Sequence, residues 1–182
     1  MFALLVLGLA LWTAAHLFKR LAPDARAGMG DAGKAAVAVG VLAGLVLMIL
    51  GYRGAEFISV WYPPAFLVHI NNLLMLIAVF VFGMSATTGR LRGKMRHPQL
   101  TSVKIWAVAH LLVNGDLASI VLFGGLLAWA VAEVIVINRS VEWDRPAPGE
   151  AKGDVKLVII TLVVFAGITA VHNWLGVWPF PG

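Results

Sequence analysis

The sequence contains no cysteine and few charged residues. Only 13% of its 182 residues are Asp, Glu, Lys or Arg, whereas 60% are apolar, and the mean hydropathy is +0.90. The absence of cysteine excludes disulfides, thiolate nucleophiles, iron–sulfur clusters and covalently attached c-type haem. So little charge excludes a soluble protein of this length. We therefore expect residues 1–182 to form a single domain of an integral membrane protein.

Apolar runs that approach the length of a membrane crossing occur six times. We expect an all-α bundle of six transmembrane helices at about 2–18, 35–51, 65–84, 99–113, 117–138 and 156–176. The first run does not have the order of a cleaved signal peptide, because Lys19 and Arg20 follow its apolar residues instead of preceding them. Trp61 and Tyr62, followed by two prolines, are typical of the boundary between bilayer and water.

The basic residues lie almost entirely on one side of this bundle. Segments 19–34, 85–104 and 139–156 share a side and hold four, five and four of the 14 Lys and Arg residues. Arg53 alone falls on the other side. The positive-inside rule makes the basic side cytoplasmic and places both termini in the periplasm. The net charge of +5 therefore indicates orientation and contact with lipid headgroups, and not nucleic-acid binding.

Five histidines lie in or beside the expected spans. An ionisable side chain at membrane depth is costly and indicates a functional site. The helical rise places His69, His110 and His172 in one layer, about 6–8 Å inside the outer surface. His16 and His97 lie in a second layer at the cytoplasmic ends of their spans. The thirteen residues from His97 to His110 rise about 20 Å as a helix, so these two cannot serve one small site.

Aromatic residues one helical turn from these histidines are suited to a planar cofactor, although ordinary helix packing also produces them. Trp12 precedes His16 by four residues, and Trp106, His110 and Asn114 follow one another at the same spacing, which predicts one helix face. Two imidazoles can ligate haem iron axially, so the pattern favours non-covalent haem b. Zinc is less favoured, because no carboxylate or thiolate accompanies the histidines at that depth. The candidate cofactor-binding residues are His110, His16, His69, His97, Trp106 and Asn114, with His110, His16 and His69 as candidate metal ligands.

Two acidic residues lie in or beside the fifth expected span. Glu133 lies deep within it, and we interpret it either as the buried partner of a basic group or as a contact to a substrate. Asp116 ends the turn Asn114-Gly115-Asp116 and is expected to cap the helix that follows.

One motif supports a family resemblance. Arg-His-Pro-Gln at 96–99, followed by Trp-Ala-x-Ala-His-Leu-Leu-x-Asn-Gly-Asp at 106–116, resembles the NnrU family of bacterial membrane proteins, which is associated with nitrite and nitric oxide reduction in denitrification. That family is similar to the plant 15-cis-zeta-carotene isomerase, a haem b membrane enzyme. The resemblance extends over most of the chain. It implies a place in the bacterial inner membrane, nitrite and nitric oxide reductase machinery as partners, and redox or isomerase-like activity.

The isomerase resemblance also implies haem ligation by His16 and His110. His69 and His97 match further histidines of the family, whereas His172 matches none. As helices, His16 and His110 lie more than about 15 Å apart in depth. Two imidazole nitrogens on one metal lie about 4 Å apart, given bonds of about 2 Å. The partner of His110 therefore stays open between His16 and His69.

Two further functions are alternatives. Arg-His-Pro at a helix start is also similar to the motif by which isoprenylcysteine and phospholipid methyltransferases hold S-adenosylmethionine, which implies a nucleotide site at Arg96 and His97. Those enzymes carry paired glutamates further on, whereas Glu142 and Glu150 are not adjacent here. The other alternative is a non-catalytic factor that aids the assembly of denitrification enzymes. No residue is assigned a catalytic role.

Overall fold

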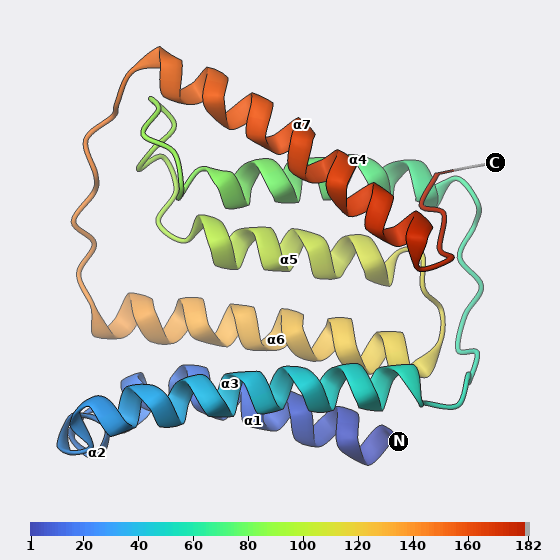
Figure 1. Cartoon of the computed structure of the whole chain (residues 1–182), viewed down its shortest axis with the longest axis horizontal. Coiled ribbons are helices and arrows are strands. Elements are labelled where there is room, and N and C mark those ends of the chain that lie inside the picture. The colour runs from blue at the N-terminus through green and yellow to red at the C-terminus, as the bar shows by residue number, and fades with distance from the viewer. Residues whose placement is uncertain (181–182) are drawn as a thin grey trace. The chain divides into compact units, whose positions relative to one another are not determined.

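The computed structural model of the chain describes residues 1–180, and its regular elements there are all helices, as expected (Figure 1). The seven helices are α1 (Phe2–Leu21), α2 (Pro23–Gly28), α3 (Gly30–Arg53), α4 (Leu67–Gly83), α5 (Pro98–Leu111), α6 (Leu117–Ser140) and α7 (Ala151–Trp174). Six of them coincide with the expected spans. The short α2 was not expected, because the polar residues of 19–34 predict a loop.

Four helices, α1, α3, α6 and α7, are long and apolar enough to cross a membrane. Helix α4 has 17 residues and α5 has 14, which correspond to about 26 Å and 21 Å of rise. The outward surface of the long helices is apolar: on α7, Val155, Ile159, Leu162 and Val163 are all exposed. Apolar side chains facing outward along a whole helix are expected when lipid is the solvent. The chain is therefore a multi-pass membrane protein.

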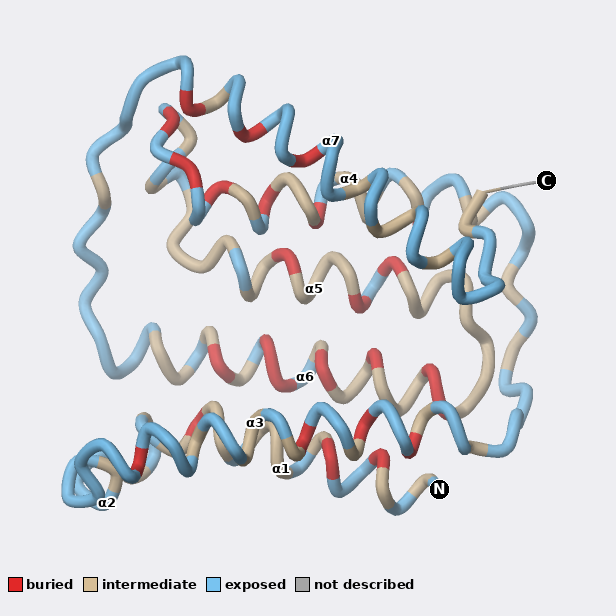
Figure 2. The backbone as a smooth tube through the Cα atoms, in the orientation of Figure 1, coloured by how far each residue is buried: buried red, intermediate tan, exposed pale blue. Residues whose placement is uncertain are grey.

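The chain divides into two compact units, which are described separately. The first comprises Met1–Tyr62 and Asn114–Val141, and the second comprises Pro63–Val113 and the chain from Glu142 onward. In the first unit α1 packs against α3 and α6, and in the second α4 packs against α5 and α7. Figure 2 shows that most of the buried positions lie along these helices, whereas the connecting loops are largely exposed.

Glycines allow α1 and α3 to approach closely in the first unit. A methyl group added at Gly44 would lie 2.9 Å from the backbone nitrogen of Trp12, and one at Gly8 would lie 2.6 Å from that of Met48. Such close backbone approach through small residues is characteristic of membrane helix pairs. The glycine contact therefore fixes the height of α1, and with it the height of Trp12 and His16.

Helix α6 begins where the sequence places its cap. Asp116 accepts a hydrogen bond at Oδ1 from the Ser119 backbone N–H (2.9 Å) and one at Oδ2 from the Ser119 hydroxyl (2.5 Å). The Ser119 hydroxyl also lies 2.9 Å from the hydroxyl of Tyr52 on α3. The expected N-cap role of Asp116 is confirmed, and it joins the start of α6 to the end of α3.

In the second unit α4, α7 and the loop after α4 form a small core of Val81, Met84 and Leu157. The loop is attached to the start of α7 by Asp154, whose Oδ1 accepts a hydrogen bond from the Leu91 N–H at 3.1 Å. Helices α4 and α5 are joined by Ser102, whose hydroxyl donates to the carbonyl of Ala78 at 2.7 Å.

Candidate functional site

In the first unit, His16 on α1 is held between two tryptophans. Its Nδ1 lies 2.9 Å from the carbonyl oxygen of Trp12, one turn earlier. A carbonyl oxygen only accepts, so Nδ1 carries the proton and Nε2 of the neutral ring keeps its lone pair. The imidazole centroid is 4.3 Å from the ring of Trp12 and 4.8 Å from that of Trp129 on α6. These contacts fix the orientation of the ring.

Both tryptophans of this cluster, and a carboxyl group one turn along α6 from Trp129, carry buried polar atoms that have no hydrogen-bond partner. They are Nε1 of Trp12, Nε1 of Trp129 and Oε2 of Glu133, which lies one turn beyond Trp129 on α6. Trp129 is 6% exposed and Glu133 is 8% exposed. Buried polar groups are nearly always paired, and an ionisable group at membrane depth indicates function. Of the two interpretations of Glu133, an ion pair with a basic group is not found among the described residues.

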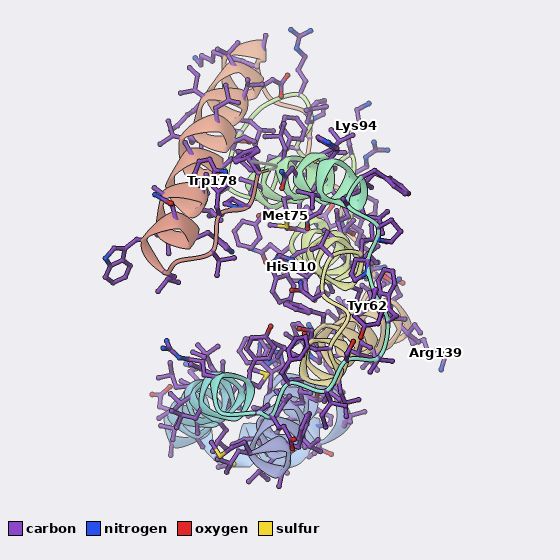
Figure 3. The ribbon with its side chains drawn as sticks, turned by 90° about the vertical axis from the view of Figure 1, so that its right-hand side faces the viewer. Tyr62, Met75, Lys94, His110, Arg139 and Trp178 are labelled. Atoms are coloured by element: carbon purple, nitrogen blue, oxygen red, sulfur yellow. The ribbon has the colours of Figure 1, made fainter. Side chains whose placement is uncertain are left out.

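In the second unit, His110 on α5 is held in the same way as His16. Its Nδ1 lies 2.9 Å from the carbonyl oxygen of Trp106, and the two rings are 5.1 Å apart. Figure 3 shows His110 on α5 and Met75 on the neighbouring α4. On α7, Nδ1 of His172 makes the corresponding contact to the carbonyl oxygen of Ile168 at 2.8 Å.

The other predicted site residues are placed differently. His69 is exposed on α4, so the shared depth of His69, His110 and His172 does not bring three imidazoles together. No group of three His, Cys, Asp or Glu side chains within residues 1–180 could hold a metal ion. Beyond His69, Asn71 is buried with Oδ1 unpartnered, while Asn72 donates to the carbonyl of Pro179 at 2.9 Å.

Trp106, His110 and Asn114 were expected to share one face of a helix, and only Trp106 and His110 lie on a common helix. Helix α5 ends at Leu111, and Asn114 belongs to the first unit, so the helical spacing that grouped Asn114 with His110 does not apply. A cofactor contact from Asn114 stays a prediction. His97 is the N-cap residue of α5, with Pro98 at the first helical position, as the sequence indicates.

One family of known proteins matches most of the chain. The family described as NnrU protein matches residues 4–179. The chain belongs to the NnrU family. No curated protein and no solved structure matches it.

The NnrU match runs through both units and includes all five histidines, so the resemblance stated from the motif at 96–116 is confirmed at the level of the family. The ligand roles of His16, His69 and His110 in this NnrU chain stay predictions. Sequence reasoning missed Trp129, which packs on His16. Its spacing of four residues from Glu133, inside an apolar span, is the signal that could have found it.

Proposed function

We propose that this NnrU chain is a six-span protein of the bacterial inner membrane that binds haem b through intramembrane histidines, with His110 as one ligand and His16 or His69 as the other, and that it supports nitrite and nitric oxide reduction. In this proposal α4 and α5 also cross the bilayer, and both termini are periplasmic. The asymmetry of the Lys and Arg residues and the position of a helix at each expected span support this topology.

The observation that carries the haem proposal is the shared setting of His16 and His110. Each ring donates its Nδ1 proton to the carbonyl of a tryptophan four residues earlier, at 2.9 Å in both cases. Metal-bound histidines usually donate their second ring N–H to a carbonyl or carboxylate, which fixes the tautomer and leaves Nε2 for the metal. The two histidines therefore fit the chemistry of axial haem ligands.

The surroundings of both histidines also suit a porphyrin. Trp12 and Trp129 pack against His16, and Trp106 packs against His110, so aromatic surface lies beside each candidate ligand. When bound, haem would supply one-electron or ligand-binding chemistry. The protein residues hold the imidazole tautomers and exclude water. His172 has the same backbone contact but no tryptophan, and His69 is exposed, so both fit less well.

Absorption spectra of the purified full chain, expressed with ample haem supply, test this proposal. We expect a Soret band with the reduced-minus-oxidised spectrum of haem b held by two imidazoles. His110→Ala should lose the haem or convert it to a high-spin form, and His16→Ala should do the same if His16 is the partner. Conversion by His69→Ala instead would assign the partner to His69. A wild-type protein without a Soret band would refute haem binding.

The role in denitrification is tested in cells. A strain of the source bacterium that lacks the gene should consume nitrite and nitric oxide more slowly, and His110→Ala should reproduce that defect. Full rescue by His110→Ala would instead favour the non-catalytic assembly factor. The matched control is His172→Ala, which removes a histidine with the same backbone contact from the same unit.

A further inference from the structure

Helix α7 is fixed to the second unit mainly near its beginning. Its buried residues, Gly153, Leu157 and Thr161, all lie in its first half. Gly153 passes so close to Gly89 that a methyl group would not fit between them, and Leu157 is fully buried. The last half of the helix has no buried residue, and among the described helices α7 packs against α4 alone. The helix packing of α7 therefore provides a firm attachment at one end only.

The segment after α7, residues 175–180, turns back along the helix (Figure 1). Gly176 has a φ of +83°, and its N–H donates to the carbonyl of Asn173 at 3.0 Å, while the N–H of the next residue donates one turn further back. These are the two hydrogen bonds of a Schellman motif, in which a left-handed glycine reverses the chain. The reversal brings the ring of Phe180 against the ring of Phe165, with centroids 6.4 Å apart, nine residues before the end of α7. We call residues 175–180 the strap.

A side-chain hydrogen bond joins the strap to α4. The carboxamide of Asn72 donates from Nδ2 to the carbonyl oxygen of Pro179 at 2.9 Å. Asn71 donates in turn to Oδ1 of Asn72 at 3.0 Å, which fixes the direction of the Asn72 side chain. Asn71 is only 8% exposed, so the helix packing holds this pair of amides in place. The strap therefore ties the last half of α7 to α4.

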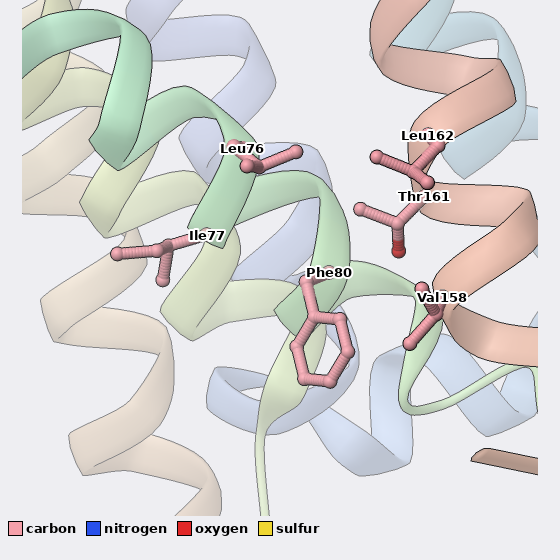
Figure 4. Close-up of a pocket in the computed structure, with 6 residues that line it drawn as sticks. All are labelled: Leu76, Ile77, Phe80, Val158, Thr161 and Leu162. Atoms are coloured by element: carbon pink, nitrogen blue, oxygen red, sulfur yellow. The ribbon is translucent and has the colours of Figure 1, made fainter. Parts of the chain in front are cut away.

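A pocket of about 260 Å³ lies between the firm attachment of α7 and the strap. Helices α4 and α7 line it with Leu76, Ile77, Phe80, Val158, Thr161 and Leu162 (Figure 4). Asn72 lies four residues before Leu76, and Phe165 lies four residues after Thr161. The two residues that hold the strap therefore continue the helix faces that line the pocket. The strap lies at one end of the pocket, and the attachment around Leu157 lies at the other.

We propose that α7 is a lateral gate, hinged at the attachment around Leu157 and held shut by the strap. When Asn72 releases the carbonyl of Pro179, the last half of α7 leaves α4 and opens the pocket to the surrounding bilayer. The strap is suited to release, because the bond that ties it to α4 is a neutral hydrogen bond and its Trp178 is 56% exposed. One such bond shifts an equilibrium by only about three- to five-fold. Neither the gate nor its test depends on haem.

The alkylation rate of a single introduced cysteine measures the opening, because the chain has no cysteine of its own. The reporter is Thr161→Cys, since residue 161 is 4% exposed and its hydroxyl has no hydrogen-bond partner to lose. The full chain in lipid vesicles is treated with the neutral reagent N-ethylmaleimide, and mass spectrometry follows the reaction. Asn72→Leu keeps the size of the side chain but removes the donor, so it should speed alkylation about three- to five-fold. Phe180→Ala, which removes the ring packed on Phe165, should also speed it.

Ala78→Cys is the matched reporter, because Ala78 is 2% exposed at the contact between α4 and α5, away from α7. Its alkylation should not respond to Asn72→Leu. Asn173→Leu removes an exposed carboxamide that does not hold the strap, and it should leave the rate at Thr161→Cys unchanged. Equal acceleration at both reporters would mean that the whole unit loosens, and it would overturn the gate. So would a rate at Thr161→Cys that neither Asn72→Leu nor Phe180→Ala raises.

Discussion

The imidazole of His16 meets the indole of Trp129 edge to face, with ring centroids 4.8 Å apart across α1 and α6. Trp129 also packs against Trp12 at 5.4 Å, so one tryptophan of α6 covers two aromatic residues of α1. This contact joins two segments more than a hundred residues apart in sequence. It makes Trp129 the residue that keeps the candidate ligand in a fixed orientation within the first unit.

Replacing Trp129 by alanine should destabilise the protein by about 3 kcal/mol, because a large buried ring leaves a cavity. Trp129→Phe should cost less, since it keeps an aromatic ring against His16. Chemical unfolding in detergent, followed by circular dichroism, measures both. Trp174→Ala is the control, because that side chain is 83% exposed and should have little effect on stability. Equal losses for Trp129→Ala and Trp174→Ala would contradict the described packing.

Replacing Glu133 by leucine should stabilise the protein and impair its function. A buried acceptor without a partner costs about 1–3 kcal/mol, and a leucine of similar size removes that cost. The free energy of unfolding should therefore rise by about 1 kcal/mol or more, while growth on nitrite falls. Glu142→Leu, in the exposed loop after α6, should change neither quantity. A lower stability of Glu133→Leu would mean that the carboxyl group has a partner in the folded protein.

Replacing Gly44 by isoleucine should prevent α1 and α3 from packing. The added side chain would have to occupy space beside the backbone of Trp12, which cannot move without displacing the whole helix. We expect a loss of at least about 2 kcal/mol in unfolding free energy. The control is Gly124→Ile on α6, where a methyl group would meet nothing within 4 Å. If both variants unfold alike, the close approach of α1 and α3 is not what holds the first unit together.

The positions of the helices follow from the sequence because the length of an apolar run, and the capping or turn residues at its ends, are local properties of the sequence. Helix α6 was expected at 117–138 and runs from Leu117 to Ser140, since Asp116 fixes its start. Helix α3 was expected to begin at residue 35 but begins at Gly30, because charged residues such as Asp31 and Lys34 can form the first turn of a helix outside the apolar core. Hydropathy therefore predicts the apolar part of a helix, and not the residue at which the helix begins.

The candidate sites could be predicted only within single helices. The pairs Trp12 with His16 and Trp106 with His110 follow from a spacing of four residues. The contact of Trp129 with His16 depends on which faces of α1 and α6 meet. No sequence pattern within a single helix predicts those faces. Depth is likewise insufficient: His69 and His110 were assigned to one layer, but His69 faces outward because height along a helix does not determine direction around it.

Replacing Asp154 by alanine should release the basic loop that follows α4. Its carboxylate accepts the hydrogen bond from the Leu91 N–H and lies 3.6 Å from Nε of Arg90. The arginine side of the ion pair is largely exposed, so the pair contributes less than about 1 kcal/mol to holding the loop. The hydrogen bond to the Leu91 N–H should therefore contribute most of the attachment. Limited trypsin digestion measures the effect, because the loop contains cleavable bonds after Arg90, Arg92 and Lys94, and cleavage should be several-fold faster.

Asp154→Asn separates the two contributions, because asparagine keeps an acceptor oxygen for Leu91 but loses the charge that faces Arg90. It should be cleaved at nearly the wild-type rate. Asp144→Ala, in the exposed loop between α6 and α7, should leave cleavage unchanged and controls for the loss of a negative charge. If Asp154→Ala resists trypsin as well as the wild type does, the loop is held by the close contact of Gly89 with Gly149 and Gly153, and not by the carboxylate.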